Sequence, residues 1–150
     1  MKFDEKISHL VGAIDDVLIS LGQHKLVENP DFVFGELSCE SWLDARFERQ
    51  GAVDLRFIVA SSEIRIDIDR AEEALHIDPS IYQEHLEDLR HLVTMLFTCR
   101  IRVEHCGKKY TRIDFFDSNN ECIDSITHRT SLFYLKLNCT TREYPPIYEA

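Results

Sequence analysis

Apolar residues recur every three or four positions over the first 21 residues of the chain. They are Phe3, Ile7, Leu10, Val11, Ile14, Val17, Leu18 and Leu21. This spacing places them on one face of an α-helix, and of the apolar residues only Ile19 falls outside that face. Gly22 follows the last of them, and Asn29-Pro30 prevents a longer helix. The pattern therefore predicts an amphipathic helix that ends near Gly22.

From residue 32 the period changes to two. After a short aromatic segment at 32–37, the alternating apolar residues are Leu43, Ala45 and Phe47, then Val53, Leu55, Phe57 and Val59, then Ile64, Ile66 and Ile68. Polar turn residues separate these runs at 49–51 and 61–62. Such alternation predicts an antiparallel meander of four strands with one face on a core.

Two helix-start signals follow this meander. Asp69-x-x-Glu72 is similar to a capping box and predicts a short helix near residues 70–76. Asp78-Pro79 supplies an N-cap residue and a proline at the first helical position. The longer helix that we predict from there has an apolar stripe of Tyr82, Leu86, Leu89, Val93, Leu96 and Phe97.

Alternation returns in the last third of the chain. It predicts a strand around 99–104, a hairpin turn at 106–108 and a strand that contains Ile113 and Phe115. Further strands are predicted near 121–127 and 131–138, and Pro145-Pro146 ends regular structure. The order helix, four strands, helix, four strands predicts an α+β fold in which two main helices pack on antiparallel β-meander sheets, one or two in number. We expect a single domain over residues 1–150, with a pseudo-repeat of 1–77 and 78–150 in element order alone.

Charge is concentrated in the middle of the chain. The 150 residues carry a net charge of −10, and residues 28–88 hold 16 acids against five arginines. Such a field repels phosphate backbones, so we expect no nucleic-acid partner. It attracts a basic protein and accelerates its encounter. The alternative is that the net negative charge serves no partner and only prevents the protein from aggregating.

Known catalytic and cofactor motifs are missing from the sequence. The five glycines are too scattered for a phosphate-binding loop, and the histidines lack the spacing of a zinc-binding helix. Asp67 and Asp69 could share an ion, but a solvated strand end explains them better. Cys106 beside His105 is a weak nucleophile candidate. We therefore predict no catalytic, cofactor-binding or metal-ligating residues and no cofactor.

The compartment is predicted from cysteine usage and from the N-terminus. Five cysteines without C-x-x-C spacing favour buried free thiols in a reducing cytosol. Asp4 and Glu5 lie where a signal peptide carries positive charge, and no apolar run is long enough to span a membrane. We expect a cytoplasmic protein without a membrane partner.

The single tryptophan lies on a polar strand face. If Leu43, Ala45 and Phe47 face the core, Trp42 shares the opposite face with charged residues of its own strand and its neighbours. An aromatic anchor amid charges that steer a partner is typical of protein interfaces. The alternatives are that a bulge turns Trp42 inward or that Trp42 caps the sheet edge. The predicted partner interface consists of Trp42, Asp44, Glu48, Asp54, Asp67, Asp69, Glu72 and Glu73.

One segment carries a resemblance to a known class of proteins. Residues 110–123, YTRIDFFDSNNECI, predict a strand, an Asp/Asn turn and a second strand. In a small, acidic α+β chain without catalytic motifs, this segment resembles those of bacterial immunity proteins of contact-dependent inhibition and related polymorphic toxin systems. The resemblance implies a tight one-to-one complex with a basic toxin domain, often a nuclease. Such an inhibitor covers or distorts the toxin's active site and needs no chemistry of its own.

Two other classes stay open. Acidic cytosolic secretion chaperones are similar in length and also begin with an amphipathic helix followed by strands. They are usually dimers that hold an extended effector segment, but they normally close with a helix, where this chain closes with predicted strands and Pro145-Pro146. An enzyme with a scattered active site is the third class. The sequence leaves open whether the protein is a monomer or a homodimer.

Overall fold

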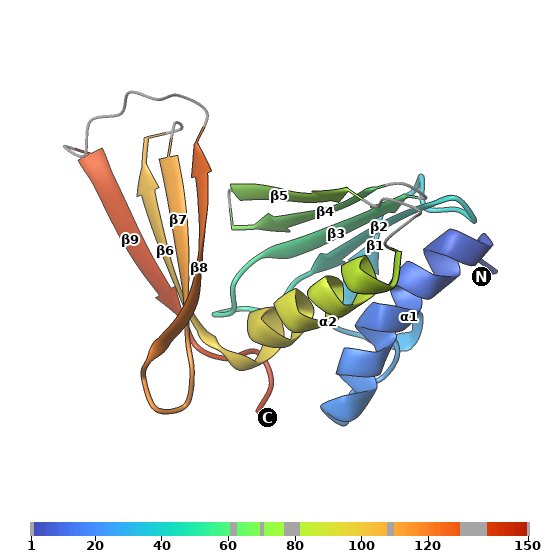
Figure 1. Ribbon diagram of the computed structural model, residues 1–150, viewed down its shortest axis with the longest axis horizontal. Coiled ribbons are helices and arrows are strands. Elements are labelled where there is room, and N and C mark those ends of the chain that lie inside the picture. Colours follow the sequence, from blue (N-terminus) through green and yellow to red (C-terminus); the bar gives the residue numbers. More distant parts are fainter. Residues whose placement is uncertain are drawn as a thin grey trace.

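A computed structural model describes residues 2–60, 63–69, 71–76, 82–107, 110–129 and 138–149, with only the backbone described at 73–76 and 82. This part of the chain forms two α-helices, one short 3₁₀ helix and nine strands (Figure 1). In chain order they are α1 (Glu5–Ser20), η1 (Leu26–Glu28), β1 (Phe32–Phe34), β2 (Trp42–Phe47), β3 (Leu55–Ala60), β4 (Glu63–Ile68), β5 (Ala71–His76), α2 (Tyr82–Thr98), β6 (Arg100–Cys106), β7 (Tyr110–Phe116), β8 (Cys122–Arg129) and β9 (Cys139–Tyr144).

The strands form two antiparallel sheets. The larger has the order β1-β2-β3-β4-β5 and the smaller the order β8-β7-β6-β9. Both helices pack on one face of the larger sheet, and the smaller sheet stands at the end of this layer (Figure 1). The α+β class with two helices and antiparallel sheets is therefore confirmed. The order differs from the prediction because five strands, not four, precede α2.

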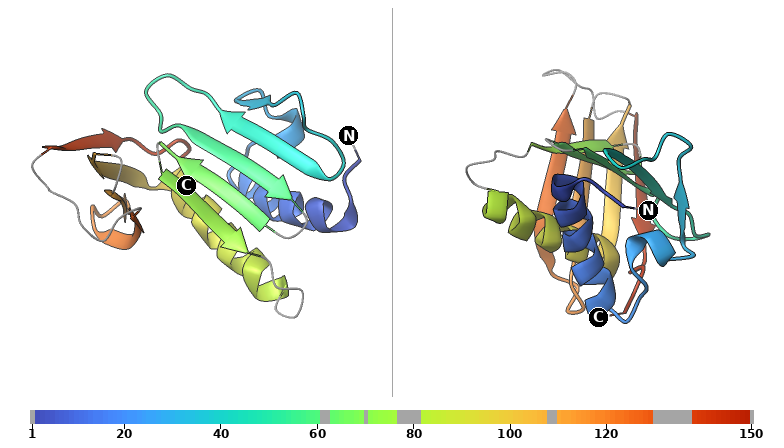
Figure 2. Two further views of the ribbon diagram at one scale, coloured as in Figure 1. Left: turned by 90° about the horizontal axis from the view of Figure 1, so that it is seen from above. Right: turned by 90° about the vertical axis from the view of Figure 1, so that its right-hand side faces the viewer.

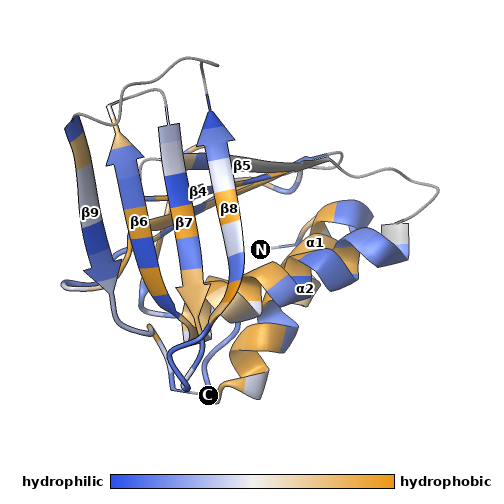
Figure 3. Ribbon diagram, turned by 60° about the vertical axis from the view of Figure 1, so that its left-hand side comes forward, coloured by the Kyte–Doolittle hydropathy of each residue, from blue (hydrophilic) through white to orange (hydrophobic). Residues whose placement is uncertain are grey.

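The spacing of apolar residues along the helices and strands explains which side chains form the core. The apolar stripe of α1 is buried from Ile7 to Leu18, whereas Ile19 is 52% exposed, as its place off the stripe predicts. Strands β2 and β4 alternate strictly between buried and more exposed residues. The resulting cluster joins both helices and both sheets, and Figure 3 shows the matching alternation of hydrophobic and hydrophilic residues along β6 and β7.

The predicted helix end at Gly22 is confirmed in detail. Gly22 has a φ of +73°, which glycine adopts without strain. The amide of Gln23 donates to the carbonyl of Leu18, and the amide of Gly22 donates to that of Ile19. These two bonds form a Schellman motif and satisfy carbonyls that the helix end leaves without intrahelical partners.

The short helix predicted near 70–76 is wrong. Residues Ala71–His76 form strand β5, which pairs with β4 so that Ile68 lies opposite Ala71. Asp69 has a φ of +56°, the left-handed conformation typical of tight hairpin turns. The hairpin satisfies backbone groups that one helical turn would leave exposed, and Ala71 joins the core at 3% exposure.

The second half follows the prediction only in part. The stripe residues of α2 from Leu86 to Phe97 are buried, while the predicted helix start at residues 78–79 lies outside the described residues. The same holds for most of the strand predicted at 131–138. Strand β9, which pairs with β6, was not predicted, but the end of regular structure before Pro145-Pro146 is confirmed.

The C-terminal segment closes the core under the larger sheet. Tyr148 is 6% exposed, and its amide donates to the carbonyl of Phe97 at 2.8 Å. Its hydroxyl donates to Oδ2 of Asp31 at 2.9 Å. Burial, together with this bond to Asp31, raises the pKa of Tyr148 to about 12. The segment therefore ties α2 to the entry of β1.

Candidate functional site

The face of the larger sheet that points away from the helices is the candidate site, and we call it the outer face. The left view of Figure 2 looks onto it, with both helices behind the strands. Because successive strand residues point to opposite sides, burying Leu43, Ala45 and Phe47 places the residues between them on this face. Its strand residues include Val33, Trp42, Asp44, Arg46, Arg56, Ile58, Glu63, Arg65, Asp67 and Glu72.

Two arginines of the outer face are held in ion pairs. Arg56 donates from Nε and Nη2 to both oxygens of Asp44, at 2.9 and 2.8 Å. This paired donation holds the pKa of Asp44 below its usual range. Arg65 donates to both oxygens of Asp67, at 2.8 and 3.0 Å, and its Nη2 lies 3.0 Å from Glu72. The arginines are therefore fixed in place, and they offset only part of the acidic charge.

The outer face is hollowed at the end of the strands where β2 leads into β3. A cavity of about 480 Å³, which we call the hollow, is lined by Arg46, Glu48, Asp54, Leu55, Arg56, Asp67 and Asp69. A smaller cavity of about 210 Å³ is lined by Val33, Phe34, Gly35, Asp44, Arg46 and Glu48. Arg46 and Glu48 line both and form a loose pair at 3.9 Å. The two cavities thus lie side by side across strands β1 to β4.

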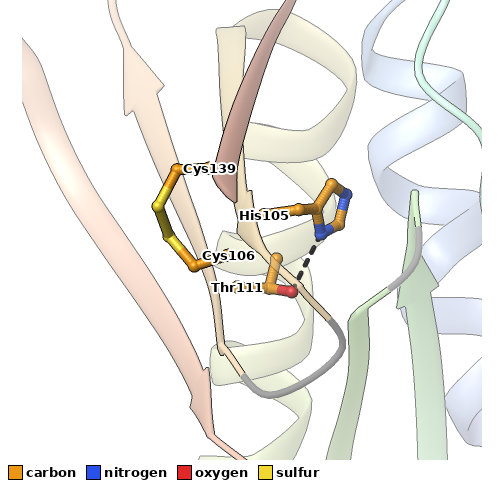
Figure 4. Close-up of a disulfide and its surroundings, with 4 residues drawn as sticks. All are labelled: His105, Cys106, Thr111 and Cys139. Atoms are coloured by element: carbon orange, nitrogen blue, oxygen red, sulfur yellow. Dashed lines mark hydrogen bonds between the residues drawn. A yellow bond between two sulfur atoms is a disulfide. The ribbon is translucent and has the colours of Figure 1, made fainter. Parts of the chain in front are cut away.

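Asp69 connects the hollow to the smaller sheet. Its side chain is 7% exposed, and its Oδ2 lies 2.9 Å from Nε2 of His105 on β6. The other ring nitrogen of His105 lies 2.9 Å from the hydroxyl oxygen of Thr111. Figure 4 shows that the ring points away from the neighbouring disulfide. Both nitrogens of His105 are occupied, so the imidazole has no nitrogen left to abstract a proton from a ligand in the hollow.

The predicted interface residues fall into two groups along the strands. Trp42 is 40% exposed and lies opposite Ala60 on β3, so the alternative of a bulge that turns it inward is wrong. Asp54, Asp67 and Asp69 gather at the hollow, at the other end of the strands. Trp42 and Phe47 are five residues apart on β2, which is about 17 Å.

The remaining predicted residues take different positions on the sheet. Asp44 binds Arg56 between the two groups, and Glu48 lines both cavities. Glu72 is exposed at the β5 edge, where it pairs with Arg65. Glu73 is placed by its backbone alone, opposite Ile66.

The prediction that all cysteines are buried free thiols is wrong. Cys106 and Cys139 lie opposite each other on β6 and β9 and form a disulfide (Figure 4). This bond also removes Cys106 as a nucleophile candidate. Cys39 and Cys122 are free but exposed, and only Cys99 is both free and buried. Burial raises the pKa of the Cys99 thiol, so this residue behaves as an inert core side chain.

Sequence reasoning missed His105 as part of the site. It lies 36 residues from Asp69 and reaches it only because β6 stands beside the β4–β5 turn. No spacing in the sequence signals that approach. Within the described residues, no three His, Cys, Asp or Glu side chains lie close enough together to hold a metal ion.

No family model, curated protein or solved structure matches this chain. Neither of the two described helices is long and apolar enough to cross a membrane. A functional assignment therefore depends on the shape and charge of the outer face.

Proposed function

We propose that this protein is a non-enzymatic inhibitor that binds a basic protein through the outer face. More specifically, we propose that it is an immunity-type protein of the bacterial cytoplasm that neutralises a basic, nuclease-like toxin domain. One observation carries the proposal: among the residues that the structure describes, no helix or strand packs on the outer face, and this face holds more acids than bases. It presents Asp44, Glu48, Asp54, Glu63, Asp67 and Glu72 against Arg46, Arg56 and Arg65.

A nuclease suits such a face because it must hold phosphate. Nucleic-acid-binding proteins neutralise phosphates with lysine and arginine side chains. Carboxylates fixed on a sheet present negative charge to the same side chains, so they would cover the toxin's substrate site. Long-range attraction between the two surfaces also accelerates their encounter.

Exposed apolar side chains at the other end of the face supply an anchor. Trp42 is 40% exposed there, and Leu37 in the β1–β2 connection is 81% exposed. Val33, which lies opposite Arg46 on the cavity beside the hollow, is also 52% exposed. Aromatic residues in a polar surround are frequent hot spots of protein interfaces. In this arrangement the charges orient the partner protein and accelerate its association, and Trp42 contributes to the affinity of the complex.

The polar groups next to the hollow favour binding over catalysis. His105 has both nitrogens engaged, and Thr111 is 8% exposed. Cys106 lies in a disulfide. A general base or nucleophile needs an unoccupied atom within reach of a substrate. The bonds and burial of His105, Thr111 and Cys106 therefore favour structural roles for these residues over catalytic ones.

The test is capture of the partner with a matched pair of charge-reversal variants. The face variant carries Glu48→Lys and Asp54→Lys. The control variant carries Glu84→Lys and Asp88→Lys, which make the same charge change on exposed positions of α2. Tagged proteins are incubated with lysate of the producing cells at low and high salt, and bound proteins are identified by mass spectrometry and then purified.

A basic protein that the wild type and the control retain, that the face variant loses and that salt releases supports the proposal. Its enzymatic activity should fall when stoichiometric wild-type protein is added. Equal retention by the face variant contradicts the proposed surface. An extended hydrophobic partner retained at high salt favours the secretion-chaperone alternative, and the absence of any partner contradicts both.

A further inference from the structure

We infer that the Cys106–Cys139 disulfide is a redox clamp that holds only one end of strand β9. Its reduction opens residues 139–142 from β6 and loosens the contact between His105 and Asp69 that joins the two sheets. Such a switch requires no partner protein, so it is independent of the proposed function.

Strand β9 is weakly held by packing. Within the described part of the chain it is the edge of the smaller sheet and pairs with β6 alone. Residues 140–143 of this strand are exposed, and Cys139 and Tyr144 are half-buried. Burial of apolar surface therefore contributes little to keeping β9 in place. Elements with few buried contacts and solvent-exposed backbone hydrogen bonds open locally at a small cost in free energy.

The two ends of β9 are held by different means. At the C-terminal end, Glu143 pairs with Arg100 at 2.9 Å, and Tyr144 packs against the core. The segment that follows is buried at Tyr148. At the N-terminal end, the disulfide of Cys139 is the one side-chain bond to another residue that the structure describes. Breaking the disulfide therefore frees the N-terminal half of β9 and leaves the C-terminal end attached.

The clamped end of β9 lies beside the contact between the sheets. Cys139 is opposite Cys106, and the next residue of β9, Thr140, is opposite His105. The disulfide and the His105 ring lie on opposite sides of β6 (Figure 4), and Thr140 shares the side of His105 because opposite residues of antiparallel strands share a face. His105 is 5% exposed, and its Nε2 lies 2.9 Å from Oδ2 of Asp69. Opening of β9 removes the neighbour on one flank of His105 and admits water to this contact.

The reductant is a low-molecular-weight thiol of the glutathione type. Cys139 is half-buried and Cys106 is 3% exposed, so the sulfur of Cys139 is the more accessible one. An external thiolate attacks it, the S–S bond breaks, and Cys106 leaves as a thiolate that takes up a proton. A second external thiol attacks the mixed disulfide and releases Cys139. The protein disulfide thus gains two electrons and two protons, two external thiols become one disulfide, and the reverse exchange restores the clamp.

The test is amide hydrogen exchange of the oxidised and the reduced protein, followed by NMR at low urea concentrations that leave the protein folded. The background is the Cys39→Ser/Cys122→Ser variant, so that the disulfide is the group that responds to dithiothreitol. Exchange through a local opening is insensitive to low urea, whereas exchange through global unfolding accelerates steeply. This difference separates release of one strand end from a general loss of stability.

Reduction should accelerate exchange of the β9 amides that bond to β6 within residues 139–142 at least about tenfold, by a route insensitive to urea. Strand β8, the opposite edge of the same sheet, is the internal control and should gain no such route. The Cys106→Ser/Cys139→Ser variant should match the reduced protein and ignore dithiothreitol. The clamp is wrong if these β9 amides exchange only through global unfolding after reduction, or open equally fast with the disulfide intact. Unfolding of the whole chain on reduction also contradicts it, because a clamp releases one strand end.

The ring proton of His105 reports on the contact between the sheets. An ionised carboxylate only accepts hydrogen bonds, so Nε2 of His105 donates to Asp69 and carries a proton. Reduction should accelerate exchange of this proton with water at least about tenfold, measured by NMR in the same samples. An unchanged rate while β9 is open would overturn the coupling to the larger sheet. Neither measurement uses a partner protein, so failure here leaves the proposed function untouched.

Discussion

A Cβ atom on Gly35 would stand 2.6 Å from Oδ2 of Asp44, closer than any side chain tolerates. The Asp44 carboxylate occupies the space that the missing side chain leaves and binds Arg56 from there. The Gly35 amide also donates to the carbonyl of Asp44 at 2.9 Å. The position of the central ion pair on the outer face thus depends on a glycine in the adjoining loop.

Gly35→Ala should therefore lower the free energy of unfolding by about 1–3 kcal/mol, because the Asp44 carboxylate must move and its pairing with Arg56 weakens. Gly12→Ala is the matched control. Gly12 lies inside α1, and apart from its two neighbours and the backbone of its own helix no atom lies within 4 Å of its would-be Cβ. Alanine should therefore raise the free energy of unfolding by about 0.5–1 kcal/mol. Urea unfolding measures both changes, and equal effects would refute the role of Gly35.

Trp42→Ala should separate binding from folding. Trp42 is 40% exposed, so its loss should cost only about 1 kcal/mol of stability but about 2 kcal/mol or more of partner binding. Phe47→Ala, five residues along the same strand and fully buried, should cost about 3–5 kcal/mol of stability. If urea unfolding shows equal losses for the two variants, Trp42 is a core residue and the anchor hypothesis is wrong.

The sequence predicted those parts of the fold that repeat with a fixed period. Helix α1 buries the stripe from Ile7 to Leu18, and strands β2 and β4 each bury one face. In these elements the spacing of apolar residues in the sequence therefore shows which side chains point to the core. The polar face with Trp42 and Asp44 followed from the same parity. Strand β9 reads Cys-Thr-Thr-Arg-Glu-Tyr, which carries no alternation of apolar and polar residues, and it was missed.

Contacts between distant segments were beyond sequence reasoning for a different reason. The capping-box pattern at Asp69 is a local signal, and pairing of β5 with β4 overrode it. The bond of Asp69 to His105 and the disulfide between Cys106 and Cys139 arise from the placement of whole strands. Asp69 lines the hollow and is held by the first of these contacts, so its place there could not be predicted from the sequence.

The disulfide yields a prediction about redox state. Cys106 and Cys139 are 33 residues apart in the sequence, and closing a loop of this length restricts the unfolded chain. Reduction should lower the free energy of unfolding by about 2–4 kcal/mol. The Cys39→Ser/Cys122→Ser variant should show the same loss, since those thiols are free and exposed. The Cys106→Ser/Cys139→Ser variant should not respond to reductant.

A wild-type protein whose urea midpoint ignores reductant would contradict this disulfide contribution. The same bond tests the proposed compartment, because a reducing cytoplasm keeps most thiols unpaired. Rapid alkylation in intact cells should then find both cysteines reduced, whereas complete protection of both argues for an oxidising compartment.

Asp114 should control the stability of the smaller sheet in acid. Its side chain is 5% exposed and accepts hydrogen bonds from Ser125 at 2.6 Å and from Arg102 and Arg112 at 2.9 Å each. Burial alone would raise the pKa of Asp114, but these three donors outweigh it and hold the pKa below its usual range. The folded state therefore favours the ionised carboxylate.

The sign of the pH effect follows from that depression. The stabilisation by Asp114 is complete above the unfolded-state pKa of about 3.9 and is lost as the pH falls through the lower folded-state pKa. Asp114→Asn should lower the free energy of unfolding at neutral pH by about 1–3 kcal/mol, because the two arginines lose a charged acceptor. It should also flatten the loss of stability below about pH 4.

Asp88→Asn, on an exposed position of α2, should retain the wild-type slope. Urea unfolding between neutral pH and about pH 3 measures these slopes, and an Asp114→Asn slope as steep as that of the wild type would show that Asp114 does not carry the acid sensitivity.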